Sequence, residues 1–150
     1  MIQWKVVYDF ESGMLGWNRT GTAFNNQPTR GDYKHKGKWL IRSSASPTYQ
    51  AGSIQGEEAT GTMTSPPFKI LGNRLRFLIG GGCNINSERV ELLINGEVVD
   101  KATGKCTETM VAKYWNVEKY EDQRGQLRLV DNSSGRWGHI NFDHLEMFGR

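Results

Sequence analysis

The segment 89–100, RVELLINGEVVD, constrains the fold more than any other part of the chain. Two apolar runs flank Asn95-Gly96, and this dipeptide is the signal of a type I′ β-hairpin. The segment therefore predicts two antiparallel strands joined by a two-residue turn. Two antiparallel sheets packed face to face bury short strands of this kind best.

Further short runs of β-forming residues follow one another along the chain, separated by turn formers. We expect strands at residues 3–10, 39–43, 61–64, 74–79, 107–117, 126–131 and 137–148. Residues 11–21 and 25–38 are expected to be loops, and residues 117–124 a charged turn with a possible helical turn. With about nine or ten strands and no convincing helix, the pattern predicts an all-β jelly-roll sandwich of two antiparallel sheets.

The final strand breaks its own alternation. Ile140 and Phe142 share one face, whereas Leu145 and Met147 have the opposite parity. A regular strand cannot bury all four on one side. The sequence predicts a β-bulge near Asp143-His144 that resets the phase; the alternative is a strand covered on both faces.

Length and charge restrict the class of protein. A chain of 150 residues is expected to form a single domain, residues 1–150. The net charge of +3 does not indicate nucleic-acid binding, and no apolar run reaches membrane-spanning length. The start reads as a strand without the layout of a signal peptide, so we expect a module of a larger protein.

Cys83 and Cys106 each sit in a loop after an apolar run. A disulfide between them would stabilise the fold by roughly 3 kcal/mol; the alternative is two buried thiols that never pair. Two Asn-x-Ser/Thr sequons, at Asn18 and Asn132, point outside the cell. We therefore expect an extracellular protein with a paired disulfide.

Catalysis finds no support in the sequence. His139 and His144 fall on opposite faces of a regular strand, and neither HExxH nor CxxC occurs. The glycine run 80–82 lacks the lysine and helix of a phosphate loop, so it suits a close approach of backbones or amides exposed to a ligand. We expect a non-catalytic binding domain that requires no cofactor.

Three predicted loops carry the groups that hold a sugar, namely an aromatic face, planar amides and arginines. The candidates are Phe24, Asn25, Gln27 and Arg30 in one loop; Asn84, Asn86 and Arg89 in another; and Arg136, Trp137, His139 and Asn141 in the third. We expect these loops to share one end of the sandwich. The alternatives are ordinary polar loop residues and a Trp137 that is simply the first core residue of the last strand.

The stretch 30–42 is locally basic and interleaved with aromatic residues. It holds Arg30, Lys34, Lys36, Lys38 and Arg42 beside Tyr33 and Trp39. Such a pattern can bind a polyanion or an acidic partner. The alternative, a solvated loop, needs no partner at all.

A structural calcium ion is a further hypothesis. Asp9, Glu11 and Asp143 offer oxygen ligands near the two chain ends, which often lie together in a jelly roll. The alternative is that Glu11 and Asp143 accept ordinary hydrogen bonds from loop amides.

Several motifs occur in order across nearly the whole chain. They are YDFESG (8–13) with GW (16–17), TGTAF (20–24), GTMTSP (61–66), RFLIGGG (76–82), VDKATG (99–104), and VDNSSG (130–135) leading into WGHI (137–140). Together they resemble carbohydrate-binding module family 66, the fructan-binding module of bacterial levanases, and its extracellular relatives. The stretch 29–56 departs from the family's pattern, as does Asn84-Ile85-Asn86.

The resemblance implies a jelly-roll sandwich whose pocket takes the terminal fructose of levan or a related fructan through acidic and arginine side chains. It carries over Glu11, Phe24 and the strand 137–143, with Arg42, Arg76 and Arg89 as candidate pocket arginines. Such modules tether an attached glycoside hydrolase to its polysaccharide. We therefore expect a glycan-binding module, and the alternative is an extracellular protein-interaction or adhesion domain that uses the basic loop 30–42.

Overall fold

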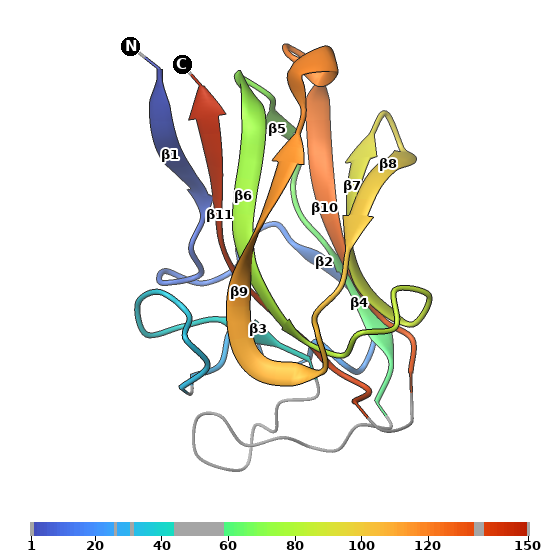
Figure 1. The fold of residues 1–150 in the computed structure, drawn as a ribbon. Coiled ribbons are helices and arrows are strands. Elements are labelled where there is room, and N and C mark those ends of the chain that lie inside the picture. Colours follow the sequence, from blue (N-terminus) through green and yellow to red (C-terminus); the bar gives the residue numbers. More distant parts are fainter. Residues whose placement is uncertain (1, 26, 31, 44–58, 134–136, 150) are drawn as a thin grey trace.

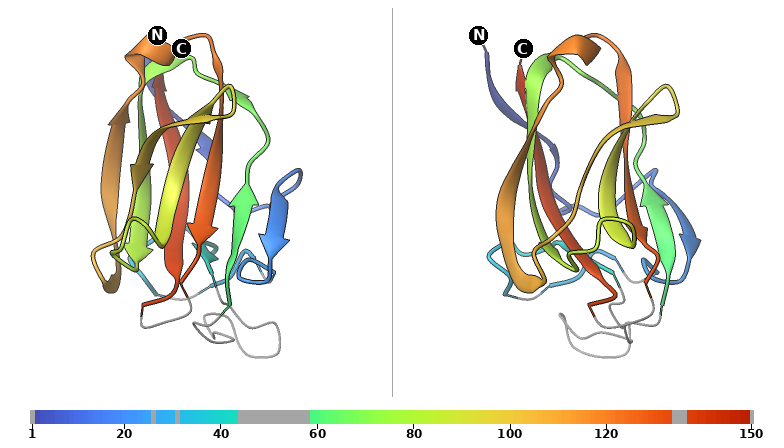
Figure 2. Two further views of the ribbon diagram at one scale, coloured as in Figure 1. Left: turned by 90° about the vertical axis from the view of Figure 1, so that its right-hand side faces the viewer. Right: turned by 45° about the vertical axis from the view of Figure 1, so that its right-hand side comes forward.

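The computed structural model describes residues 2–25, 27–30, 32–43, 59–133 and 137–149. Two antiparallel sheets face each other, as the sequence predicts (Figures 1 and 2). One sheet has the order β1-β11-β6-β9, with β3 also pairing with β11; the other has the order β2-β4-β10-β7-β8, with β5 pairing with β10. No α-helix occurs in these residues, and no helix there could cross a membrane.

The five-stranded sheet contains β1 (Gln3–Tyr8), β3 (Ile41–Arg42), β6 (Gly72–Gly81), β9 (Thr107–Asn116) and β11 (Ile140–Gly149). The six-stranded sheet contains β2 (Asn18–Gly21), β4 (Gly61–Thr64), β5 (Phe68–Lys69), β7 (Glu88–Ile94), β8 (Glu97–Ala102) and β10 (Arg124–Asp131). A single 3-10 turn, η1 (Glu118–Tyr120), lies within the charged turn expected there.

The core fills the space between the two sheets with alternate residues of each strand. Phe77 and Phe142 of one sheet and Leu92, Leu127 and Leu129 of the other are all buried. This alternation leaves every second side chain on an outer face, where binding residues can be displayed.

Two local predictions are confirmed. Asn95 and Gly96 have φ angles of 53° and 82°, the two positive values that a type I′ turn requires. The β11–β6 register shifts between Asp143 and Glu146, and His144 has a φ of 57°. The bulge therefore lies where the parity of the last strand predicts it.

Other boundaries differ from the expectations. The last strand begins at Ile140, because Trp137 lies in a turn with a φ of 58°. The first strand ends at Tyr8, because Phe10 adopts a φ of 64° as it enters the core. Strand β2 lies inside a predicted loop, since its four residues are all exposed and carry no apolar alternation.

Candidate functional site

The end of the sandwich away from the termini brings together loops that are far apart in the sequence (Figure 1). A disulfide joins Cys83, after β6, to Cys106, before β9, with Cα atoms 4.9 Å apart, which confirms the predicted pair. The amide of Gly82 donates to the carbonyl of His139, before β11, at 2.8 Å. We call this end the rim.

A polar cluster lies at the rim, which we call the rim cluster: Arg42, Glu108, His139 and Asn141. Nη2 of Arg42 donates to Oε2 of Glu108 at 2.6 Å, and Nε2 of His139 lies 2.5 Å from Oε1. Nδ2 of Asn141 donates to the backbone carbonyl of Glu108 at 3.3 Å. The four residues come from β3, β9, the turn before β11 and β11 itself, so only the folded sheet brings them together.

Neighbouring groups fix the position of Arg42. Its backbone amide donates to Oε1 of Gln27 at 2.8 Å, and Nε2 of Gln27 donates back to its carbonyl at 2.5 Å. Its guanidinium carbon lies 5.5 Å from the ring centroid of Tyr33, within reach of a cation–π contact. Because Arg42 is buried, this guanidinium is held in one orientation.

The electrostatics of the rim cluster favour a fixed charge on Glu108. Burial opposes its ionisation, but hydrogen bonds with His139 and Arg42 outweigh burial and lower its pKa to about 2. The carboxylate is therefore ionised throughout the neutral range. It acts as an anchor for both cationic partners.

The rim cluster retains unused hydrogen-bonding capacity. Among the described residues, Nε and Nη1 of Arg42 and Oδ1 of Asn141 are buried without partners. Buried polar atoms of this kind normally find a partner in the protein, in water or in a ligand. The half-buried indole of Trp137 lies beside them, its ring 5.7 Å from that of His139. Donors, an acceptor and a flat apolar face thus lie close together.

Two carboxyl groups lie behind the rim cluster. Glu88 and Asp131 face each other across the β7–β10 pair, and both are buried. Burial raises the pKa of Asp131 to about 7, and nearby Glu88 adds to the shift, whereas a hydrogen bond with Ser43 reduces it. Asp131 is therefore partly protonated at neutral pH.

Gly82 shows why a glycine run occurs here. A Cβ at this position would overlap Oε1 of Glu88 and the carbonyl oxygen of Trp137. The predicted close approach of backbones is therefore confirmed at Gly82. It brings the loop after β6 against the Trp137 turn.

Some predicted ligand residues lie elsewhere. Phe24 is 1% exposed within the core, so the expectation that its ring meets a ligand is wrong. Arg30 stacks over Trp39 at 5.2 Å, away from the rim cluster. Arg136 lies outside the described residues.

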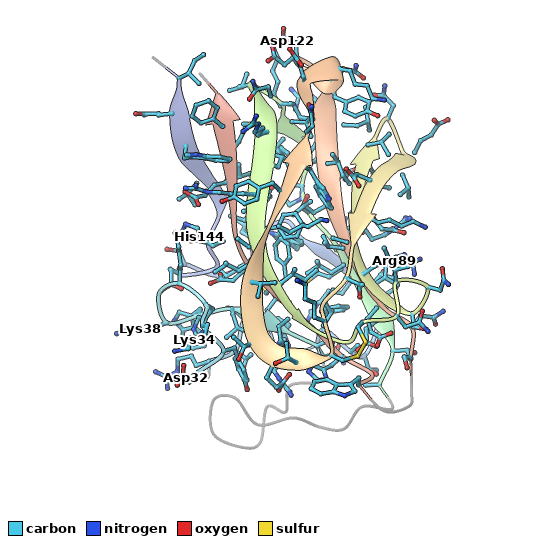
Figure 3. The ribbon with its side chains drawn as sticks, viewed as in Figure 1. Asp32, Lys34, Lys38, Arg89, Asp122 and His144 are labelled. Atoms are coloured by element: carbon cyan, nitrogen blue, oxygen red, sulfur yellow. A yellow bond between two sulfur atoms is a disulfide. The ribbon has the colours of Figure 1, made fainter. Side chains whose placement is uncertain are left out.

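The loop 84–86 and Arg89 also make other contacts. Oδ1 of Asn84 accepts the amide of Asn86 at 3.0 Å, which closes the turn. Arg89 lies on the outer face of the six-stranded sheet, on the opposite side of the molecule from His144 (Figure 3). There it lines a groove of about 590 Å³ together with Arg128.

Sequence reasoning missed Glu108. Its neighbours Thr107 and Thr109 give it the appearance of an ordinary edge-strand residue. Its partners lie 66 and 31 residues away, so no local spacing signals the contact.

The proposed calcium ligands hold the loop 33–39 in place. Glu11 accepts the amides of Lys38 at 2.9 Å and Trp39 at 2.8 Å, and Oδ2 of Asp143 accepts the amide of Lys36 at 2.9 Å. These are the loop-amide bonds that the alternative interpretation expects. No group of three or more His, Cys, Asp or Glu side chains in the described ranges has a metal-binding arrangement.

Asp143 nevertheless retains an unused ligand atom. Its Oδ1 is buried without a hydrogen-bond partner. Burial raises its pKa to about 8, with Glu11 and Asp9 adding to the shift and the Lys36 amide opposing it. Three carboxyl groups are thus close enough to influence one another, which is the charge pattern that a cation would relieve.

Comparison with known proteins defines the fold. TmCBM61 in complex with β-1,4-galactotriose superposes with a TM-score of 0.60 at 15% identity, over 95% of this chain and 94% of that one. A family 35 carbohydrate-binding module from Clostridium thermocellum gives 0.54 at 11% identity, over 99% of both chains. The K3 cleaved adhesin domain of Lys-gingipain from Porphyromonas gingivalis gives 0.53 at 10% identity, over 96% and 98%. The chain therefore has the jelly-roll fold found in carbohydrate-binding modules.

Sequence comparison adds a fungal relative. The chain is 34% identical over 144 residues to ecdE of Aspergillus rugulosus, a protein whose name carries a provisional glycosyl hydrolase assignment. The match covers 93% of this chain and 20% of the relative, so the chain spans about a fifth of that protein's length. No family model matches the chain.

Proposed function

We propose that this chain is a non-catalytic carbohydrate-binding domain whose rim cluster binds a glycan end. The observation that carries the proposal is the set of unpartnered buried atoms on Arg42 and Asn141 beside Trp137. Guanidinium and amide groups suit sugar hydroxyls, and an indole suits the apolar face of a sugar ring. The jelly-roll fold shared with carbohydrate-binding modules agrees with this role.

The state of Glu108 argues for binding rather than turnover. A glycosidase needs one carboxyl group as a proton donor and a second positioned across the scissile bond. The pKa of Glu108 is lowered to about 2, and both of its oxygens are engaged by Arg42 and His139. This carboxylate therefore orients its neighbours and has no proton to give.

The proposed ligand is the terminal fructose of a fructan such as levan. The basis is the motif resemblance, together with an arginine and an acidic residue paired at the rim. We further propose an extracellular protein in which the module tethers an attached glycoside hydrolase to its polymer. The two termini lie side by side at the end away from the rim, so attached domains would leave the rim free (Figure 1).

Calorimetric titration against levan oligosaccharides, inulin oligosaccharides and β-1,4-galactotriose tests the proposal. We expect binding to at least one glycan, strongest for levan, and a loss of about tenfold or more in Trp137→Ala, equivalent to about 1.4 kcal/mol. Trp39→Ala is the matched control, because this half-buried indole lies under Arg30 instead. Equal affinities for the wild type and Trp137→Ala would refute a binding site at the rim.

We also propose that Asp143, with Asp9 and Glu11, holds a structural calcium ion. The unpartnered Oδ1 of Asp143 supports this, and backbone carbonyls would complete the oxygen shell. The thermal midpoint should rise when calcium is added to chelator-treated protein, and this rise should vanish in Asp143→Asn. A midpoint that calcium leaves unchanged would count against the site.

The loop 30–42 supports a second candidate function, an extracellular protein-interaction or adhesion domain. Lys34 and Lys38 are exposed and extend from the loop (Figure 3), whereas Glu11 and Asp143 fix its backbone. A rigid loop that displays two ammonium groups suits an acidic protein surface. Such binding would depend on both lysines and not on Trp137.

A further inference from the structure

A hollow of about 160 Å³ lies on the outer face of the five-stranded sheet, away from the rim cluster. It is formed by three strands and one loop. Its principal side chains are Arg76 and Leu78 of β6, Tyr114 of β9, His144 and Glu146 of β11, and Lys36 of the loop. The loop 33–38, fixed by the bond between the Lys36 amide and Asp143, separates the hollow from the rim.

The β-bulge in β11 shapes this hollow. His144 is the extra residue, and its φ of 57° is a conformation that non-glycine residues rarely adopt. Its Nε2 lies 3.6 Å from Oε1 of Glu146, and its side chain is largely buried. Bulges commonly redirect a side chain next to a functional site, and strained residues concentrate there.

Aromatic rings stand beside the hollow. The Tyr114 side chain lines it and is 55% exposed, although it lies in the middle of a paired strand. The ring of Trp4 lies edge-on to Tyr114 at 6.2 Å and stacks under the Arg76 guanidinium at 3.9 Å. Tyr114 therefore offers a flat apolar surface, and Trp4 fixes the neighbouring guanidinium.

The polar groups of the hollow are mixed in sign and already oriented. Nε and Nη2 of Arg76 donate to the two carboxylate oxygens of Glu146 at 2.8 and 3.2 Å. Lys36 adds a further donor. Paired donors and acceptors beside an aromatic face suit a neutral hydroxylated ring better than an ion. A cavity of about 150 Å³ accommodates benzene, so this hollow has room for one six-membered ring.

We propose that this hollow is a second sugar-binding subsite, which takes a single neutral sugar ring stacked on Tyr114. The inference rests on the proposed carbohydrate-binding function but not on the rim as its location. Two subsites on one domain would let it hold a polysaccharide at two points. Binding at the first point then raises the effective concentration at the second.

Nuclear magnetic resonance of the tryptophan indole N–H groups tests this directly, because Trp4 reports on the hollow and Trp137 on the rim. Each signal is identified by its loss in Trp4→Phe or Trp137→Phe. Levan oligosaccharides and β-1,4-galactotriose are the probes. We expect a glycan that shifts both signals, with a stoichiometry of two ligands per chain.

Tyr114→Ala should abolish the Trp4 shift and lower the stoichiometry to one, while the Trp137 shift persists. Lys113→Ala is the control, because this exposed neighbour on β9 does not line the hollow. If the Trp137 signal responds and the Trp4 signal stays fixed at saturation, the second subsite is refuted and the rim site stands. If only the Trp4 signal responds, the hollow stands and the rim proposal fails. No response at either signal to either probe would overturn both.

Discussion

Two arginine–glutamate clusters on this molecule differ in how they are built. In the rim cluster, a buried Arg42 meets Glu108 from another strand and keeps two nitrogens without partners. On the outer face of the six-stranded sheet, Glu91 accepts Nε of Arg89 at 2.8 Å and Nε of Arg128 at 2.6 Å. Both of these arginines reach solvent, with 22% and 36% of their side chains exposed.

The difference shows what a buried ion pair with spare donors implies. Water completes the hydrogen bonds of Arg89 and Arg128, so the Glu91 cluster explains itself as a solvated surface network. Water reaches Arg42 much less, so its spare donors indicate a ligand or an ordered water. The same residue types thus mark a structural network on one face and a candidate site at the rim.

Removing the glutamate from each cluster should separate them most strongly. Glu108→Ala leaves the Arg42 guanidinium buried without its carboxylate, so we expect the free energy of unfolding to fall by about 3 kcal/mol. Glu91→Ala leaves two arginines that can turn to solvent, so we expect a loss of about 1 kcal/mol. Urea denaturation of both variants measures the difference.

Glycan affinity provides an independent reading of the same pair. Glu108→Ala should weaken binding at the rim by more than tenfold, whereas Glu91→Ala should leave it unchanged. Arg42→Lys refines the comparison, since lysine keeps the charge but loses the planar donor geometry. Equal losses of stability and affinity in the two glutamate variants would contradict the assignment of the site to the rim.

The two clusters also differ in how far sequence reasoning reaches. Arg89 and Glu91 are two residues apart on a predicted strand, so alternation alone places them on one face. The hairpin at Asn95-Gly96 and the bulge at His144 were predictable for the same reason, because each depends on neighbours in the chain. Glu108 meets Arg42 only through the pairing of β3, β11, β6 and β9. Phe24 was misassigned because the sequence of a loop does not show which of its aromatic residues enters the core.

Breaking the disulfide should affect the rim alone. Cys83→Ser with Cys106→Ser opens a loop with a sequence separation of 23 residues, for which we expect a stability loss of about 3 kcal/mol. Glu108 follows Cys106 by two residues, so the rim cluster should loosen and glycan affinity should fall. Titration and urea denaturation of the double variant measure both effects. Unchanged glycan affinity would show that β9 positions Glu108 without help from the disulfide.

The carboxyl group behind the rim cluster predicts a pH dependence of stability. The pKa of Asp131 is raised to about 7 by burial and by Glu88, whereas the unfolded chain ionises near the ordinary value of 3.8. The native state holds the proton more tightly, so its stability is highest below about pH 4 and is lost as the pH rises toward 7. Between pH 5 and pH 6 the expected loss from this group is about 1.4 kcal/mol.

Asp131→Asn should flatten this pH dependence, as measured by urea denaturation at each pH in calcium-free buffer. Glu91→Gln is the control from the opposite cluster, because hydrogen bonds and charges from Arg89 and Arg128 outweigh burial and lower the Glu91 pKa. Its contribution is present above the unfolded pKa and is lost only in acid. A slope between pH 5 and pH 6 that survives Asp131→Asn would place the proton on another group, of which Asp143 is the first to test.

Salt should have the smallest effect and should distinguish the rim from the basic loop. Stacking on Trp137 and hydrogen bonds to neutral hydroxyls are only weakly screened, so glycan affinity should change less than about twofold between 0.05 and 0.5 M salt. Binding of an acidic partner through Lys34 and Lys38 would weaken steeply over the same range, because exposed charges are screened over about 10 Å at 0.1 M. A steep salt dependence that disappears in the double variant Lys34→Ala/Lys38→Ala, with Trp137→Ala without effect, would transfer the function from the rim to the loop. The rim would then need ordered water, rather than a sugar, to satisfy the guanidinium of Arg42.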